Sequence, residues 1–208
     1  MRIQLPKVYP ITDTEISGLS HCEQVKRLLE GSASLIQLRE KRGSPRLFYA
    51  DAKAALQVAR SANAKLIIND RVDIAFALRA DGVHLGQEDM PVDAARRILG
   101  DDVVIGFSTH NLEQVHQALR LPIDYLAFGP IFPTTSKRNP DPVAGLNQLR
   151  LVRELARPMP VVAIGGINRF NAQDVLNAGA DAVAVISALL ANPTRIAENL
   201  RHLITLVE

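Results

Sequence analysis

The stretch KLIINDRVDIAFALRADGVHLGQED, residues 65–89, contains two short apolar runs that each end in polar residues. Leu66–Ile68 leads into Asp70, and Gly82–Leu85 leads into Asp89. If the two runs are neighbouring parallel strands, both carboxylates emerge at the same edge of one sheet. Two carboxylates beside a small polar depression are what a magnesium-bound polyphosphate requires.

Size and composition indicate a single domain, residues 1–208, with a large buried core. The net charge is +2 and no block of Lys or Arg stands out, so we expect no nucleic-acid partner. The single cysteine, Cys22, excludes an internal disulfide and suits a reducing cytosol.

No segment has the character of a membrane span or an export signal. The longest apolar run, Ala182–Ala191, falls short of the roughly 20 residues that cross a bilayer. Met1–Pro10 lacks the apolar core of a secretory signal. We therefore expect a cytoplasmic protein without a membrane partner, and the sequence leaves open whether it forms a homo-oligomer.

Strand and helix patterns alternate along the whole chain. The expected strands are Lys7–Thr12, Leu35–Arg39, Leu66–Ile68, Gly82–Leu85, Val103–Phe107, Tyr125–Phe128, Val161–Ile164 and Ala182–Ile186. Capping signals such as Ser44-Pro45 start the intervening helices. Asp81, Asp124 and Asp181 each stand just ahead of an apolar strand, which suggests one structural unit used repeatedly.

Eight such units favour an α/β fold, a single small (β/α)8 TIM barrel. The alternative is an open doubly wound sheet. Against it, the chain has neither a G-x-G-x-x-G turn after the first strand nor a Walker sequence. In a barrel the chemistry gathers at the C-terminal ends of the strands, so the residues at these ends indicate the function.

The second strand ends in three polar residues that share one side. Alternation places Gln37, Arg39 and Lys41 toward the barrel mouth and the apolar residues between them toward the helices. A guanidinium and an ammonium directed at one depression are suited to hold phosphate oxygens. A structural ion pair is the alternative, and we prefer that interpretation for Glu40 and Arg42.

The third and fourth strands end in the acidic residues of the opening stretch. Asn69 and Asp70 are short polar groups where a buried strand would otherwise stay apolar. Asp89 precedes Met90-Pro91, so capping of the next helix is the plain alternative to metal binding. Paired across adjacent strands, the two carboxylates point to Mg2+, which needs few protein ligands when phosphates supply the rest.

Further polar groups follow the fifth strand. Ser108 can donate to a phosphate, and His110 is either catalytic or part of a helix cap with Asn111. His84, inside the fourth strand, is interpreted as a hydrogen-bonding residue of the barrel interior.

The loop after the sixth strand, Gly129–Gly145, is long and rich in proline. It offers three hydroxyls and two cations, and its length and limited freedom favour a loop that covers a substrate. After the seventh strand, Gly165-Gly166 allows close approach to a ligand, and Ile186-Ser187 opens a helical turn after the eighth. Barrels often bind phosphate in these two loops. Two anion sites in one mouth imply two phosphorylated substrates or one bisphosphate.

The chain resembles the thiamine-phosphate synthase family from end to end. The motifs that carry the resemblance are YPITD (9–13), IQLREK (36–41), LIINDRVDIA (66–75), ADGVHLGQED (80–89), GFSTHN (106–111), FGPIFPTTSK (128–137), VVAIGGI (161–167) and GADAVAVIS (179–187). The resemblance implies a (β/α)8 barrel that joins a pyrimidine diphosphate to a thiazole phosphate, giving thiamine phosphate and pyrophosphate. It also implies a dissociative reaction, in which a pyrimidine carbocation forms before the thiazole nitrogen captures it.

The resemblance further implies residue roles. Contacts to the pyrimidine diphosphate are expected from Gln37, Leu38, Arg39, Glu40, Lys41, Asn69, Ser108 and Lys137, of which Arg39, Lys41, Ser108 and Lys137 are catalytic. The thiazole phosphate is expected at Thr134, Thr135, Ser136, Gly166, Ile186 and Ser187, and Mg2+ at Asp70 and Asp89. Ser136 is a departure, because the family usually carries Thr at this position.

Two other functions fit the same barrel. A thiazole tautomerase would share the phosphate site and use an acid–base residue such as His110, but would not need Lys41, Asn69, Asp70 and Asp89. A non-catalytic phosphate-binding barrel would not need the metal pair.

Overall fold

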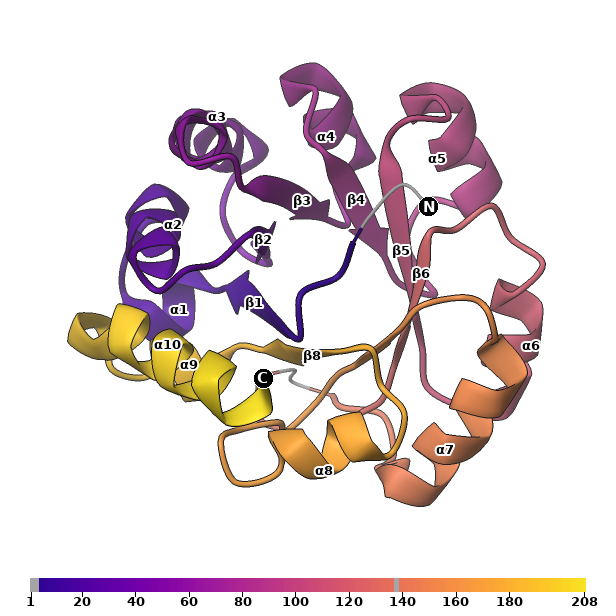
Figure 1. Cartoon of the computed structure of the whole chain (residues 1–208). Coiled ribbons are helices and arrows are strands. Elements are labelled where there is room, and N and C mark those ends of the chain that lie inside the picture. Colours follow the sequence, from indigo (N-terminus) through magenta and orange to yellow (C-terminus); the bar gives the residue numbers. More distant parts are fainter. Residues whose placement is uncertain (1–3, 137–138) are drawn as a thin grey trace.

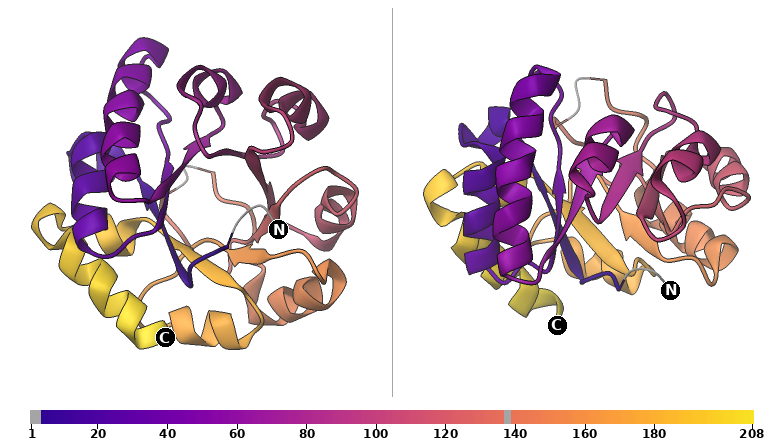
Figure 2. Two further views of the ribbon diagram at one scale, coloured as in Figure 1. Left: turned by 45° about the horizontal axis from the view of Figure 1, so that its top comes forward. Right: turned by 90° about the horizontal axis from the view of Figure 1, so that it is seen from above.

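The computed structural model describes residues 4–136 and 139–208, which form a closed barrel of eight parallel strands (Figure 1). Each strand pairs with its neighbours in sequence, and β8 closes the barrel by pairing with β1. The helices lie around the outside of the strands, as the two turned views show (Figure 2). The expected (β/α)8 barrel is therefore confirmed.

The element bounds follow the predicted order closely. The strands are β1 (Val8–Thr12), β2 (Leu35–Leu38), β3 (Lys65–Asn69), β4 (Gly82–Leu85), β5 (Val104–Thr109), β6 (Tyr125–Phe128), β7 (Val161–Ala163) and β8 (Ala182–Val185). The helices are α1 (Thr14–Ser17), α2 (His21–Glu30), α3 (Pro45–Ser61), α4 (Val72–Leu78), α5 (Val92–Leu99), α6 (Leu112–Ala118), α7 (Gly145–Ala156), α8 (Ala172–Asn177), α9 (Ser187–Leu190), the 3-10 turn η1 (Pro193–Arg195) and α10 (Ile196–Val207).

Two bounds differ from the prediction in ways that affect the site. β5 continues to Thr109, so Ser108 belongs to the strand rather than to the loop after it. The segment after β1 contains the short helix α1, where a loop was expected. Asp13 caps α1 by accepting hydrogen bonds from the N–H groups of Glu15 and Ile16.

The strands bury side chains on both faces, as parallel strands covered by helices do. On β2, Ile36 and Leu38 belong to the large core between strands and helices. On the same strand, Leu35 belongs to the smaller core inside the barrel, and Gln37 reaches the interior hydroxyl of Tyr9. The predicted alternation along β2 is therefore confirmed.

The recurrent Asp ahead of three strands has one structural role, which we call the strand latch. Each carboxylate accepts a hydrogen bond from a backbone N–H near the start of the preceding strand. The pairs are Asp81 with Leu66 N at 2.9 Å, Asp124 with Ile105 N at 2.8 Å and Asp181 with Val161 N at 2.7 Å. Arg96 and Arg153 also donate to the last two carboxylates, so these latches are charge-assisted.

Candidate active site

The acidic pair of the opening stretch lies at the C-terminal ends of β3 and β4. Asp70 follows β3 directly, and its N–H donates to the carbonyl of His84 at 2.8 Å. Its φ of 62° is a left-handed conformation that non-glycine residues rarely adopt. Such local strain clusters at functional sites.

Asp89 reaches the same place from the loop after β4. Its Oδ2 accepts a hydrogen bond from the N–H of Gly86 at 2.7 Å, and α5 has no side-chain cap, so the helix-capping alternative is not what the structure shows. Burial raises the pKa of the Asp89 carboxyl, the Gly86 N–H opposes this, and the neighbouring carboxylate of Asp70 raises the pKa further. Two carboxylates this close favour a shared proton or a cation between them.

Lys41 supplies a cation at this point. Its Nζ lies 2.5 Å from Oδ2 of Asp70, and the Lys41 side chain is about half exposed. An ion pair this exposed adds little to stability, so the lysine can exchange its partner for a ligand anion at small cost. Lys41 and Asp70 thus lie at the same mouth and form an ion pair, which the sequence analysis gave as the alternative to phosphate binding.

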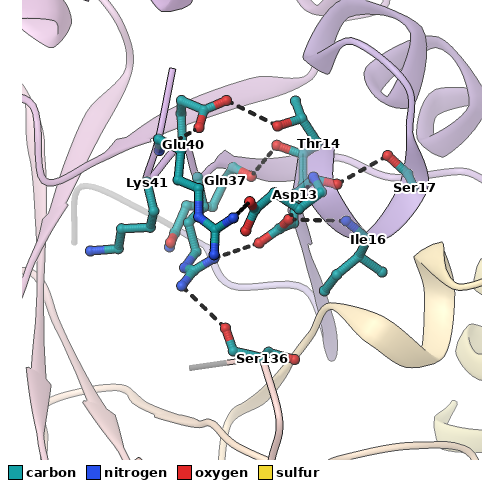
Figure 3. Close-up of polar contacts among 12 residues, drawn as sticks. Asp13, Thr14, Ile16, Ser17, Gln37, Glu40, Lys41 and Ser136 are labelled. Atoms are coloured by element: carbon teal, nitrogen blue, oxygen red, sulfur yellow. Dashed lines mark hydrogen bonds and ion pairs between the residues drawn. The ribbon is translucent and has the colours of Figure 1, made fainter. Parts of the chain in front are cut away.

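Arg39 is held by partners that the sequence analysis did not identify. One guanidinium nitrogen contacts the carboxylate of Asp13 at 2.5 Å, and another donates to the carbonyl of Ser136 at 3.2 Å. Figure 3 labels these two partners, Asp13 and Ser136, and marks the contacts with dashed lines. The pair is largely buried, which fixes the direction of the guanidinium. Asp13 follows β1 as Asp70 follows β3, so the rule used for the other strand ends could have found it.

Glu40 turns away from this cluster. It accepts hydrogen bonds from Thr14 Oγ1 at 3.0 Å and from the N–H groups of Arg42 and Gly43 at 2.8 and 2.9 Å. Burial alone would raise the pKa of Glu40, but these three hydrogen bonds lower it overall. The side chain of Leu38 is fully buried under the helices, which leaves only its backbone to face a ligand. Both residues support the loop structurally.

Asn69 and Ser108 lie next to the acidic pair on β3 and β5. Nδ2 of Asn69 is buried and has no hydrogen-bond partner among the described residues. An unsatisfied buried donor is costly and marks a place for a missing acceptor. Ser108 Oγ lies 2.8 Å from Nε2 of His84, whose burial lowers its pKa to about 4 and keeps the imidazole neutral. His84 is thus the interior hydrogen-bonding residue that the sequence predicted.

We call Arg39, Lys41, Asn69, Asp70 and Asp89 the charged side of the mouth, and Gly165, Gly166, Ile186 and Ser187 the backbone side. On the backbone side both glycines have positive φ, 90° and 68°. A Cβ on Gly166 would lie 2.5 Å from the carbonyl oxygen of Pro133. The glycine is therefore needed for packing against the loop after β6, besides any approach to a ligand.

The same loop contacts both sides, through the Ser136 carbonyl to Arg39 and through the Phe132 N–H to Gly165. The N–H of Ser136 donates to Oγ1 of Thr134 at 3.3 Å, and Phe132 N donates to the carbonyl of Gly165 at 3.1 Å. Ser187 begins α9, with Ile186 alone between it and the end of β8. Lys137, predicted to be catalytic, lies outside the described residues.

His110 has a positioning role in the structure. Its Nδ1 lies 2.6 Å from the carbonyl of Gly129, and its Nε2 lies 3.5 Å from a carboxylate oxygen of Asp141. The side chain of Asn111 caps α6. Both ring nitrogens of His110 thus face the loop after β6, which gives the acid–base role of a tautomerase no support.

The acidic pair can bind a divalent cation only if a substrate supplies further oxygen ligands. Among residues 4–136 and 139–208, no three His, Cys, Asp or Glu side chains are grouped to hold a metal ion. Asp70 and Asp89 supply oxygen ligands of the type Mg2+ prefers, and phosphate oxygens and water can complete its shell. The residues therefore fit a substrate-assisted Mg2+ site.

Comparisons with known proteins identify the family. The sequence model described as thiamine monophosphate synthase matches residues 8–189. The chain belongs to this family. The thiamine-phosphate synthase of Chloroflexus aurantiacus is 44% identical over 97% of this chain and 94% of its own. That of Albidiferax ferrireducens is 45% identical over 100% of this chain and 95% of its own.

A solved structure agrees. The thiamine phosphate pyrophosphorylase of Pyrococcus furiosus has a TM-score of 0.87 and 40% identity, covering 97% of this chain and 95% of that one. Family membership confirms the expected class of activity, an enzyme of thiamine biosynthesis that transfers an alkyl group and releases pyrophosphate. Within the described residues no helix is both long and apolar enough to cross a membrane.

Proposed function

We propose that this barrel joins 4-amino-2-methyl-5-(diphosphooxymethyl)pyrimidine to 4-methyl-5-(2-phosphooxyethyl)thiazole, giving thiamine phosphate and pyrophosphate. The observation that carries the proposal is the acidic pair Asp70 and Asp89. Lys41 forms an ion pair with Asp70, and the neighbouring Asn69 has a buried N–H donor without a partner among the described residues. A thiazole phosphate alone has no use for this cluster, whereas a diphosphate needs cations and donors.

The charged side is assigned to the pyrimidine diphosphate. Arg39, fixed by Asp13, and Lys41 would bind the diphosphate oxygens, and Asn69 would donate to a pyrimidine or phosphate acceptor. Gln37 and Ser108 would complete this set, together with the backbone of Leu38 and Glu40 and with Lys137.

Mg2+ would be held by Asp70 and Asp89 and, when bound, would neutralise charge on the diphosphate. Lys41 would then be released from Asp70 to face the leaving group. Fixed positive charge at the point where negative charge develops is the largest contribution expected from such a site.

The backbone side is assigned to the thiazole phosphate. Gly166, Ile186 and Ser187 would offer backbone N–H groups from the loops after β7 and β8, and Thr134, Thr135 and Ser136 would contribute hydroxyls from the loop after β6. The thiazole nitrogen would thereby be held close to the pyrimidine methylene carbon, so that the bimolecular capture proceeds as an intramolecular step would.

In the chemical step, the bond between the pyrimidine methylene carbon and the diphosphate oxygen breaks, and the electron pair leaves with pyrophosphate. The thiazole nitrogen then gives its lone pair to the carbocation. No side chain needs to act as a nucleophile, which agrees with a mouth that offers charges and donors.

We propose the cytoplasm as the compartment, in keeping with the single Cys22. A homo-oligomer stays compatible with this function and is tested by its mass in solution.

The experiment measures pyrophosphate release with each substrate alone, with both, and with both plus EDTA. We expect release only with both substrates and Mg2+. Isomerisation of a thiazole phosphate without any coupling would overturn the proposal in favour of the tautomerase.

A further inference from the structure

Five polar side chains form one hydrogen-bonded row inside the barrel. The contacts are Gln37 Nε2 to Tyr9 Oη at 3.2 Å, Tyr9 Oη to Tyr125 Oη at 3.2 Å, Tyr125 Oη to His84 Nδ1 at 2.8 Å and His84 Nε2 to Ser108 Oγ at 2.8 Å. All except Ser108 are buried. The row joins β2, β1, β6, β4 and β5, and its two end residues are both assigned to the pyrimidine diphosphate.

The chemistry of the end group sets the direction of the hydrogen bonds. Nε2 of Gln37 can only donate, so the hydroxyl of Tyr9 accepts from it. Among the described contacts, the other partner of the Tyr9 hydroxyl is Tyr125, so the Tyr9 hydroxyl donates a hydrogen bond to the Tyr125 oxygen. In the opposite direction the proton of Tyr9 would be buried without an acceptor, which native interiors avoid.

The same direction continues to the mouth. Tyr125, having accepted from Tyr9, donates its proton to Nδ1 of His84. A neutral imidazole carries a single N–H. Because Nδ1 of His84 accepts the bond from Tyr125, this N–H is on Nε2 and points at Ser108 Oγ. Ser108 accepts this bond and keeps its own O–H for another acceptor.

We propose that His84 is a positioning residue, whose Nε2–H donates to Ser108 so that the Ser108 hydroxyl is held as a donor toward the diphosphate. The role of Ser108 rests on the proposed function. The tautomer of His84 does not, because it follows from the buried row with Nε2 of Gln37 facing the Tyr9 hydroxyl. With the opposite tautomer, the Ser108 hydroxyl would donate its hydrogen bond to Nε2 of His84 and could only accept a hydrogen bond from the ligand.

The first test is the tautomer itself, read from the 15N chemical shifts of His84 in the wild-type chain. We expect a protonated Nε2 and an unprotonated Nδ1. A protonated Nδ1 would overturn the proposal, whether or not the protein couples the two substrates. Tyr125→Phe removes the donor to Nδ1 and should shift His84 toward the other tautomer, whereas Tyr9→Phe leaves Tyr125 to donate and should not.

The second test separates orientation from packing by steady-state kinetics. His84→Leu should lower kcat by about tenfold or more, the size of losing one oriented hydrogen bond in the transition state, with a much smaller change in KM. His84→Gln can place an N–H near the position of Nε2–H and should retain more of kcat. Equal losses in the two variants, or a wild-type kcat in His84→Leu, would overturn the proposal.

Discussion

The charged side and the backbone side of the mouth are built by different means. On the charged side, side chains neutralise one another: Arg39 pairs with Asp13, and Lys41 pairs with Asp70. On the backbone side, glycines with positive φ bring the loops after β6 and β7 into contact. In the proposed function, a ligand of the charged side would exchange ion partners, whereas a ligand of the backbone side would meet backbone N–H groups.

This difference predicts different sensitivities. Changes of charge should affect the pyrimidine diphosphate and leave the thiazole phosphate bound as before. Changes of volume at the glycines should do the opposite. The variants below test this separation, in order of decreasing effect.

Asp70→Ala should lower kcat/KM by at least about a thousandfold, because it removes a proposed metal ligand and the partner of Lys41. The measurement is pyrophosphate release over a range of Mg2+ concentrations. Asp73→Ala is the matched control, since Asp73 is largely exposed and paired with Arg71 nearby. Near-normal rates in Asp70→Ala, with the fold intact by circular dichroism, would remove the metal assignment.

Gly166→Ala should raise the KM for the thiazole phosphate by roughly tenfold and destabilise the chain by about 1–3 kcal/mol. Its Cβ would lie 2.5 Å from Pro133 O and 2.7 Å from Phe132 Cβ, at a φ of 68°. Gly18→Ala is the control for backbone strain, because Gly18 has the same φ of 68° but nothing within 4 Å of the added carbon.

Both variants are compared by urea unfolding and by titration of each substrate separately. An equal rise of both KM values in Gly166→Ala would show that the two sides are not independent. A change confined to the thiazole phosphate would sharpen the comparison.

Asp13→Asn should raise the KM for the pyrimidine diphosphate by about fivefold, because Arg39 loses the charge that fixes its direction. Asn also caps helices well, so α1 should persist and isolate the electrostatic effect. The measurement is KM for each substrate. An unchanged value for the pyrimidine diphosphate would place Arg39 outside the binding set.

Acid should destabilise the fold through His21, whose Nδ1 lies 2.7 Å from Thr12 Oγ1 and whose Nε2 lies 3.5 Å from Glu40 Oε2. Burial lowers the pKa of His21, and the carboxylates of Asp51, Glu40 and Asp13 oppose this without reversing it. The folded chain therefore keeps His21 neutral where the unfolded chain binds a proton. The free energy of unfolding should fall as the pH drops below about 6.5, the ordinary histidine value.

The check is urea unfolding of wild type and His21→Asn at several pH values. We expect a shallower loss of stability below pH 6.5 in the variant, because its side chain does not titrate. Parallel curves would assign the acid sensitivity to other groups.

The sequence predicted most of the fold because local patterns carry it. Strand alternation placed Gln37 inside the barrel, and the strand-end rule placed Lys41 and Asp70 at the same mouth. α1 escaped prediction because a helix of four residues has no periodicity to detect. Ser108 was assigned to a loop because its polarity hid the last residues of β5.

The partners of charged residues could not be read in the same way. The sequence offers several acidic residues as possible partners of Arg39, and only the closed barrel shows that Asp13 is the one it contacts. The interior row is similar: Tyr9 and Tyr125 meet across the barrel although they are 116 positions apart. Strand patterns show that a side chain points inward, but the order of strands around the barrel decides what it meets.

The strand latch has a consequence for how the chain can be divided. Asp81, Asp124 and Asp181 tie β3 to β4, β5 to β6 and β7 to β8. The barrel therefore contains three pairs of neighbouring parallel strands that are each joined by a side-chain hydrogen bond. A cut after Ala62, between α3 and β3, keeps each carboxylate in the same fragment as its backbone N–H and arginine partners, whereas a cut after Leu78 separates Asp81 from Leu66. Fragments of the first kind are the better starting points for reassembly or circular permutation.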